Sequence, residues 1–378
     1  MTKLKVAIVI PTIVTIGGNR TAFLLAKSLV DWFDVSLICY HISSELIEKV
    51  ESLISPAHLK YKYEIDGGSW STLKSLRYQF VRGRDRSLAK FIEDFDKQDF
   101  LLVISNEGKW LPNYLKRHNK HIITAISVME LNDNFFYFPY YEEIKMRFLW
   151  HIFLFPIYGI LRFFEKERYQ SFDLLFANSL WTELIFQYLY QLTVKDTIIL
   201  LDSDFWKPPL ELKDDERYIA VPTASLSGYR NAQEIIRNLV KEGLNLISYG
   251  PHKIEGVPYL GFLDDESLVK FIGNACGTLF LFDYEALGLI PFESLLCGTP
   301  VITFKKQGPF TELKSNDNIY FVTEYRDIRK ACLDLLHAGK TKSRVVSCRN
   351  SVESYSAHKV APRIAELIKN ELLQKITT

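Results

Sequence analysis

The sequence predicts an α/β fold with two doubly wound, Rossmann-like domains, and three observations support this prediction. Short apolar runs alternate with segments of helical periodicity, which is typical of parallel strands and crossover helices. This alternation occurs twice, on either side of a polar, proline-containing stretch at residues 201–209. The length of 378 residues is enough for two or three ordinary domains, or for one large one. We place an N-terminal domain at residues 1–202, a C-terminal domain at 203–358 and a final helical segment at 359–378.

The first half begins with a predicted βαβ unit. The apolar run Val6–Ile10 reads as a strand buried on both faces, and Pro11 ends it. The pair Gly17-Gly18 lies in the following loop, before a helix at Thr21–Val30 and a second strand at Asp34–Tyr40. Further strands are predicted at Phe100–Ile104, His121–Ile126 and Asp173–Ala177. The first half therefore alternates strand and helix.

The second half repeats the alternation more regularly. Strands are predicted at Arg217–Val221, Leu244–Ser248, Thr278–Phe282 and Pro300–Phe304. Helices are predicted at Asn231–Glu242, from Asp264 or Asp265 to about Ala275, at Phe292–Cys297 and at Lys359–Gln374. An aspartate at the start of the second of these helices is a typical N-cap.

Composition excludes several classes of protein. With 46 Lys and Arg against 45 Asp and Glu, the net charge is +1, so a nucleic-acid-binding protein is not expected. The five cysteines are far apart and odd in number, which favours buried, reduced thiols over disulfides or a zinc module. The eight histidines form no recognisable metal motif, and the N-terminus resembles no signal peptide. We expect a cytoplasmic protein without a metal.

A strand, a loop with one glycine and a helix carry the candidate functional residues. The strand Thr278–Phe282 leads into Glu285 and Gly288, and the following helix carries Glu293 and, in its first turn, Pro291. Loop amides and the positive end of a helix dipole form a site suited to a phosphate. A carboxylate beside a bound sugar nucleotide can accept hydrogen bonds from vicinal hydroxyls. On spacing alone, two solvated glutamates are the commoner explanation.

The surrounding residues give this stretch a resemblance to a known family. The run Glu285-Ala286-Leu287-Gly288-Leu289, followed by Glu293 and by Gly298-Thr299-Pro300, resembles the E-x7-E motif of retaining, metal-independent GT-B glycosyltransferases of family 4 (glycosyl transferases group 1). Segments similar to other family motifs follow in the family's order, at Gly17-Gly18, Asp173–Ser179, Asp204–Pro208 and Gly308–Glu312. The resemblance covers most of the chain, densely over 217–322 and thinly over 41–170.

The resemblance implies a GT-B architecture, in which two domains face a central cleft and the C-terminal helix crosses back to the N-terminal domain. It implies that the N-terminal domain binds the acceptor and the C-terminal domain binds the sugar nucleotide, a UDP- or GDP-sugar, with no other cofactor. Glu285 is the implied catalytic residue, in contact with the transferred sugar. Implied donor-binding residues are Gly17, Gly18, Arg230, Phe262, Leu263, Ala286, Leu287, Gly288, Leu289 and Glu293.

These implied roles differ by position. The backbone of Leu287–Leu289 would hold the distal phosphate and Glu293 would accept from the ribose hydroxyls. Phe262 and Leu263 would lie near the base, although a place in the core is an equal alternative for Phe262.

Several positions depart from the family pattern. Thr223 stands where an arginine is usual, and Arg230 is the cation nearest to the usual lysine position. Losing one cation beside a leaving diphosphate weakens its electrostatic stabilisation. Lys305 or Lys306 are candidates to compensate, although a solvated pair is the commoner explanation.

The N-terminal domain departs from the pattern too. Ser127 occupies the place of a common histidine, which leaves the donor's own phosphate oxygen, or Glu107 or Glu130 as weak candidates, to activate the acceptor. The D-x-D run Asp202-Ser203-Asp204 lies in the predicted linker, so we do not expect it to bind a metal.

Aromatic residues make up 14% of the chain, and 13 of them fall within the 30 residues from Phe135 to Phe164. Residues 148–161 carry no Asp, Glu, Lys or Arg, and an arginine flanks them on each side. Fourteen residues are too few to span a bilayer, but they suit an interfacial segment. Peripheral membrane contact would suit a lipid-linked acceptor, and the alternatives are a buried packing layer or a homodimer surface.

The sequence therefore predicts a retaining glycosyltransferase that moves a sugar from a nucleotide-sugar donor to a glycan or lipid-linked acceptor. Three alternatives stay open. Thr223 and Ser127 keep open a non-catalytic partner that binds a sugar nucleotide or glycan. The same two-domain frame also hosts nucleotide-sugar epimerases and phosphorylases. The sequence shows no separate phosphate or cofactor site of the kind that a phosphorylase needs.

Overall fold

The computed structural model describes residues 3–13, 19–65, 89, 98–104, 109, 111–119, 121–128, 162–211, 217–224, 230–282 and 284–377. The chain divides into two compact units, each with its own parallel sheet. Unit 1 comprises Met1–Leu200 together with Ala357–Thr378, and unit 2 comprises Leu201–Ser356.

Unit 1 contains an eight-stranded sheet in the order β2-β3-β1-β5-β6-β7-β8, with β4 paired to β3. Its strands are β1 (Lys5–Val9), β2 (Thr12–Ile13), β3 (Asp34–Ser43), β4 (His58–Ile65), β5 (Phe100–Ile104), β6 (Ile123–Val128), β7 (Leu174–Ala177) and β8 (Asp196–Thr197). Every pairing among these strands is parallel, and Val6 lies between Val35 and Phe100 in register. The strands β5 and β6 are buried along their whole length, which explains the continuous apolar sequence of β5.

Helices cover both faces of this sheet. They are α1 (Arg20–Leu29), α2 (Ile47–Ile54), α5 (Leu111–His118), α7 (Leu180–Tyr190) and α14 (Ala357–Thr377), with a 3₁₀ turn at Ser44–Leu46. Alternate residues of β1 enter different cores because successive side chains in a strand point to opposite faces. Val6 and Ile8 pack in the core that contains α1 and α14, whereas Ala7 and Val9 pack in the core that contains α5 and α7.

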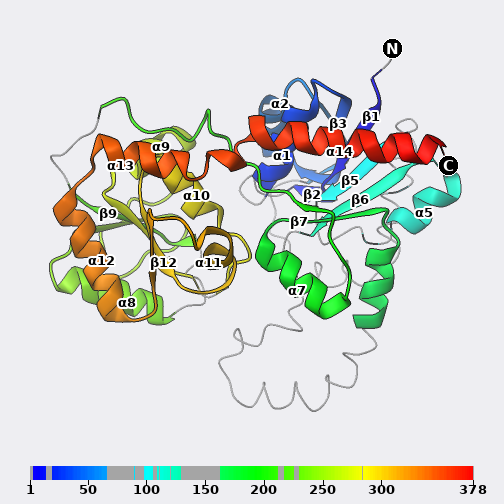
Figure 1. Cartoon of the computed structure of the whole chain (residues 1–378). Helices are drawn as coiled ribbons and strands as arrows, with labels where there is room; N and C mark the ends of the chain where they lie inside the picture. The colour runs from blue at the N-terminus through cyan, green and yellow to red at the C-terminus, as the bar shows by residue number, and fades with distance from the viewer. Residues whose placement is uncertain are drawn as a thin grey trace. The chain divides into compact units, whose positions relative to one another are not determined.

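The last helix, α14, belongs to unit 1 although it follows the whole of unit 2 in sequence. Val360, Ile364, Ile368 and Leu372 recur every four residues and are buried in the same core as Leu25 of α1. Figure 1 shows α14 in red beside the blue α1. The predicted return of the C-terminal helix to the N-terminal part of the chain is therefore present.

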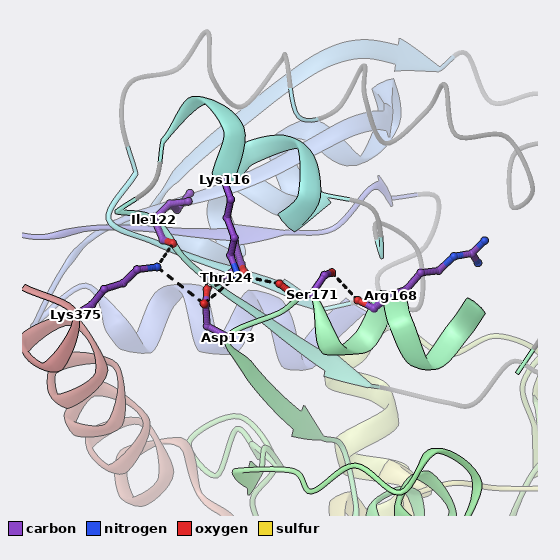
Figure 2. Close-up of polar contacts among 7 residues, drawn as sticks. All are labelled: Lys116, Ile122, Thr124, Arg168, Ser171, Asp173 and Lys375. Carbon is purple, nitrogen blue, oxygen red and sulfur yellow. Dashed lines mark hydrogen bonds and ion pairs between the residues drawn. The ribbon is translucent and has the colours of Figure 1, made fainter. Parts of the chain in front are cut away.

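Asp173 organises the edge of the sheet at which β6 and β7 begin. Its carboxylate accepts hydrogen bonds from the amide and hydroxyl of Thr124, at 2.8 and 3.0 Å, and from Lys116 Nζ at 2.9 Å. Lys375 of α14 lies 3.9 Å from the same carboxylate and donates to the carbonyl of Ile122 (Figure 2). Burial would raise the pKa of Asp173, but the Thr124 and Lys116 hydrogen bonds and the lysine charges outweigh burial and lower it.

Unit 2 contains a five-stranded parallel sheet in the order β10-β9-β11-β12-β13. Its strands are β9 (Ile219–Pro222), β10 (Leu246–Tyr249), β11 (Gly277–Phe280), β12 (Val301–Phe304) and β13 (Ile319–Val322). Its helices are α8 (Arg230–Lys241), α9 (Asp265–Asn274), α10 (Leu289–Leu296), α11 (Gln307–Leu313), α12 (Tyr325–Ala338) and α13 (Lys342–Asn350), with a 3₁₀ turn at Glu353–Tyr355. The carboxylate of Asp264 caps α9 by accepting the Ser267 amide at 2.8 Å, so Asp264 is the cap of the two aspartates predicted as candidates.

The chain connections on either side of unit 2 meet at one point. Leu201 and Ser356 form a parallel bridge, and the Leu201 amide donates to Tyr355 O at 2.9 Å. Arg349 holds the following linker residues through the carbonyls of Ser203 and Trp206, at 2.7 and 2.9 Å. The same guanidinium donates to Leu296 O at the end of α10, where a cation also complements the helix dipole.

Two further sequence expectations concern buried thiols and membrane spans. All five cysteines are buried and free, as expected. Within the described ranges, none of the helices is both long enough and apolar enough to cross a membrane.

Candidate functional site

The candidate residues of unit 2 follow the carboxyl ends of its strands. The strand order places β9 between β10 and β11. The chain therefore passes from β9 to its neighbour on one side, β10, and then crosses over to its neighbour on the other side, β11. In open parallel sheets, ligands bind beyond the carboxyl ends of the strands at such a switch point. The loops that follow β9, β10 and β11 carry Thr223, Phe262 and Glu285, respectively, and Gln307 begins the helix that follows β12.

Glu285 is half-buried and is held through three different groups. Its amide donates to Gln307 Oε1 at 2.8 Å, and its carbonyl accepts the amide of Gly308 at 3.1 Å. Its carboxylate accepts the amide of Gly288 at 3.0 Å. Both the main chain and the side chain of Glu285 are therefore fixed at the loop that leads into α10.

Gly288 is the N-cap of α10 and has φ 75° and ψ 81°, a left-handed conformation that favours glycine. An added Cβ would lie 3.1 Å from Glu285 Cγ and 3.2 Å from Pro309 Cγ. The amides of the first turn of α10 follow directly, and they and the helix dipole provide partial positive charge. The sequence expectation placed this helix at Phe292–Cys297, but it begins three residues earlier, so Pro291 is its third residue.

Gly308 approaches the Glu285 loop more closely than any side chain would allow. A Cβ on Gly308 would lie 1.9 Å from the carbonyl oxygen of Ala286. Ala286 and Leu287 are themselves buried, so the loop has apolar packing on one side and the α11 backbone on another. Leu289, the first residue of α10, is half-buried.

Glu293 lies one turn into α10 and is half-buried. Burial first and the charge of Glu293 second raise the pKa of Tyr249, the last residue of β10. Burial also raises the pKa of Cys297 to about 12, with a further contribution from Glu293. The charge of Glu293 therefore acts on the end of β10, the strand that precedes the Phe262 loop.

Phe262 is 80% exposed, which excludes the alternative that it is a core residue. The neighbouring Leu260 is 49% exposed, and Gly261 between them has φ 74°. Leu263 is half-buried. A phenylalanine ring in water beside the carboxyl edge of a sheet is available to stack on a flat ligand.

Thr223 is fully buried and faces inward. Its hydroxyl donates to Tyr249 O at 2.9 Å and accepts the His252 amide at 3.1 Å. Thr223 therefore ties the ends of β9 and β10 together and does not present a polar group to a ligand.

Neither lysine that follows β12 is simply solvated. Lys305 is exposed, with Nζ 5.5 Å from the Phe310 ring centre. Lys306 is half-buried, with Nζ 5.2 Å from the Phe282 ring and 5.0 Å from the Phe304 ring. These cation–π contacts place one ammonium group above the aromatic residues at the ends of β11 and β12.

The structure does not place the other predicted residues at this site. Gly17 and Gly18, Glu107, Glu130 and the segment 148–161 lie outside the described residues. Arg230 begins α8, and its side chain is not described. Ser127 is buried near the carboxyl end of β6 in unit 1.

The D-x-D run in the linker has a structural role. Asp202 accepts the Phe205 amide at 3.0 Å and so closes a turn. Among the described residues, no three histidine, cysteine or acidic side chains converge as a metal site.

Sequence reasoning missed the roles of Gln307 and Gly308. The similarity of Gly308–Glu312 to a family motif marked the segment but gave no reason for the residue before it. The hydrogen bond from Glu285 to Gln307 joins residues 22 apart, and no local pattern predicts it.

Part of unit 2 matches the model of a known protein family. Residues 251–350 match the family model described as glycosyl transferases group 1. The matched stretch includes Phe262, Glu285, Gly288, Glu293 and Gln307. The chain carries a glycosyltransferase domain.

Solved structures similar to the whole chain support the fold around this glycosyltransferase domain. Sucrose-phosphate synthase from Thermosynechococcus elongatus aligns with a TM-score of 0.73 at 13% identity, over 98% of this chain and 100% of that one. Anabaena Alr3699/HepE in complex with UDP and glucose aligns with a TM-score of 0.68 at 13% identity, over 97% and 99% of the two chains. These matches confirm the predicted α/β fold of GT-B type. No curated protein matches by sequence.

Proposed function

We propose that this protein is a retaining, metal-independent glycosyltransferase of family 4 that transfers a sugar from a nucleotide-sugar donor. The observation that carries the proposal is the placement of Glu285, whose carboxylate lies on the Gly288 amide at the N-terminus of α10. In this proposal the backbone at Leu287–Leu289 receives the distal phosphate, and Glu285 contacts the transferred sugar. In this proposal the carboxylate and the phosphate site are adjacent because the same loop carries both.

Charge stabilisation of the leaving diphosphate is assigned to α10 and Lys306. Developing negative charge on the leaving group is stabilised by oriented amides and a helix N-terminus, which need no reorganisation during the reaction. The buried hydroxyl of Thr223 cannot replace the arginine usual at its position, because both of its hydrogen bonds are to the main chain. Of the two lysines after β12, Lys306 is the half-buried one, and its Nζ lies 5.2 Å from the ring of Phe282, three residues before Glu285.

The nucleotide is assigned to the loop after β10 and to Glu293. Phe262, exposed by 80%, is the proposed stacking partner of the base, with Leu263 beside it. Glu293, whose charge reaches Tyr249 at the end of the same strand, is the proposed acceptor for the ribose hydroxyls. UDP-sugars are the first donors to test, because Alr3699/HepE, which shares the fold, is seen with UDP and with UDP-glucose.

The acceptor is assigned to unit 1 as a glycan or lipid-linked precursor at the cytoplasmic face of a membrane. The support is the aromatic segment between Phe135 and Phe164. At the C-terminal end of this segment the structure describes Phe163 and Phe164, whose side chains are 60% and 48% exposed. Tyr169, five residues later, is buried against Phe186 and Tyr190. The exposed rings suit an interfacial contact through residues 148–161, and a homodimer surface is the alternative.

A second candidate function is a non-catalytic partner that binds a sugar nucleotide without turning it over. The inward-facing Thr223 favours it, because a binding protein has no need of the cation that a departing diphosphate requires. One measurement distinguishes an enzyme from a binding protein: whether a nucleotide sugar that binds is also turned over.

The test begins with a thermal-shift screen of UDP-, GDP-, ADP- and dTDP-sugars, followed by transfer assays with each donor that stabilises the protein. We expect Glu285→Gln to abolish transfer, while Glu324→Gln, an exposed glutamate at the start of α12, leaves it unchanged. Proton NMR of the product reports whether the anomeric configuration is retained. Absence of a shift with every donor contradicts the proposal, binding without turnover selects the non-catalytic partner, and an isomerised donor selects an epimerase.

A further inference from the structure

One residue at the candidate site has a backbone conformation that its type rarely adopts. Gln307, the first residue of α11, has φ 54°. Elsewhere among the described residues, Gln191 is the other non-glycine residue with positive φ, and it ends α7. A left-handed residue is common just after a helix, which accounts for Gln191. Gln307 begins a helix, so this explanation does not apply to it.

The turn itself does not call for a glutamine. Glycine adopts a left-handed conformation without steric strain, and asparagine tolerates it better than most residues. The glutamine side chain therefore contributes something that a glycine would not. Its Oε1 accepts a hydrogen bond from the Glu285 amide, at 2.8 Å.

This bond is one of a pair that fixes Glu285 between neighbouring residues of α11. The side chain of Gln307 accepts the Glu285 amide, and the amide of Gly308 donates to the Glu285 carbonyl at 3.1 Å. The Gly308 backbone is also so close to the Ala286 carbonyl that no side chain fits at position 308. The Gly308 bond comes from the backbone, whereas the Gln307 bond depends on residue type.

We propose that Gln307 is a positioning residue for Glu285, which it holds in place through the main chain of the loop. Its carboxamide oxygen fixes the Glu285 amide, and the fixed main chain directs the carboxylate to the sugar of the donor. The proposal rests on the proposed function of Glu285, and Gln307 itself contacts no substrate in it. Strained residues persist where the surrounding structure and the function hold them.

The variants that test this role are Gln307→Gly and Gln307→Asn. Both residues adopt the left-handed conformation, and neither places an acceptor at the reach of the glutamine side chain. The matched control is Gln191→Gly, which changes the same residue type at the same φ, on an exposed helix end in unit 1. We expect all three variants to unfold within about 4 °C of the wild-type protein.

The expected result is a loss specific to Glu285. In Gln307→Gly and Gln307→Asn, kcat/KM for transfer falls about 10- to 100-fold, as for a reacting group displaced by up to about 1 Å. Affinity for UDP without a sugar stays within a factor of about two, and Gln191→Gly changes neither quantity. Hydrogen exchange at the Glu285 amide becomes faster in the Gln307 variants only.

A double-mutant cycle separates positioning from a general structural role. In a Glu285→Ala background the Gln307→Gly substitution should cost no further activity, because the group it positions is gone. Fully additive losses, or an unchanged exchange rate of the Glu285 amide, overturn the inference. If Glu285→Ala leaves only residual transfer while both Gln307 variants retain wild-type kcat/KM, the inference fails and the proposed function stands. If the wild-type protein binds and transfers no sugar from any donor, the proposed function fails, and the inference with it.

Discussion

Gly308→Ala is predicted to inactivate the protein by displacing the Glu285 loop. The added Cβ would lie 1.9 Å from the Ala286 carbonyl oxygen, and a contact between such atoms shorter than 3.0 Å is essentially never seen. The two segments must therefore separate by about 1 Å, which is 3.0 Å less 1.9 Å. A misplacement of about 1 Å at a reacting group costs about 100-fold in rate, or about 2.7 kcal/mol in transition-state free energy.

Transfer kinetics and thermal unfolding, measured on the same samples, test this reasoning. Gly243→Ala is the control, because Gly243 lies two residues after α8, has φ 86°, and has no neighbouring atom within 4 Å of the added Cβ. The control should lose about 1 kcal/mol of stability from the left-handed conformation and keep its kcat/KM. If Gly308→Ala retains kcat/KM within a factor of three of the wild-type protein, then Glu285 does not depend on this close approach, and our account of the loop is wrong.

Three further predictions concern other residues. Phe262→Ala should leave stability within about 0.5 kcal/mol, because the ring is exposed, and should weaken nucleotide affinity by about 1–3 kcal/mol in calorimetry. A loss of stability without a loss of affinity would return Phe262 to a packing role. Thr223→Val should lower the free energy of unfolding in urea by about 1–3 kcal/mol, since it removes the two hydrogen bonds that the buried hydroxyl makes to the Tyr249 carbonyl and the His252 amide. A neutral result would mean that water or another group replaces the hydroxyl. Asp173, whose pKa is lowered in the folded protein, contributes stability that is complete above its unfolded pKa of about 3.9 and is lost as pH falls through the folded value. The stability difference between wild type and Asp173→Asn should therefore be constant from about pH 6 to 7 and shrink in urea titrations below about pH 4, and a difference independent of pH would contradict the ionic role.

The sequence was sufficient for the strands and helices whose periodicity is strong. Phe100–Ile104 is β5 with the predicted ends, and α1 and β3 lie within a few residues of their predicted positions. These segments are buried on one helical face or along a whole strand, so their patterns are local and regular. The short strands β2 and β8 have two residues each, too few for a period, and β4 carries lysines between its apolar residues.

The candidate site was predictable where it is continuous in sequence and not where it depends on distant contacts. Glu285, Gly288 and Glu293 occupy one loop and one helix, so a single motif contains them. The direction in which Thr223 faces depends on Tyr249 and His252, more than 20 residues away, and only the structure shows it buried. The exposure of Phe262 likewise depends on the path of its loop after β10. The local sequence around this aromatic residue does not predict that path.

The sequence position of α14 constrains the order in which the protein can be completed during synthesis. Ile364 and Ile368 share a core with β1 and α1, yet they are translated after all of residues 201–356. Unit 2 has all of its strands and helices once its last residues leave the ribosome, whereas the sheet of unit 1 must wait with part of one apolar face uncovered. Unit 1 is therefore started before unit 2 and finished after it, and residues 1–200 expressed without α14 would expose the apolar surface that α14 covers to aggregation.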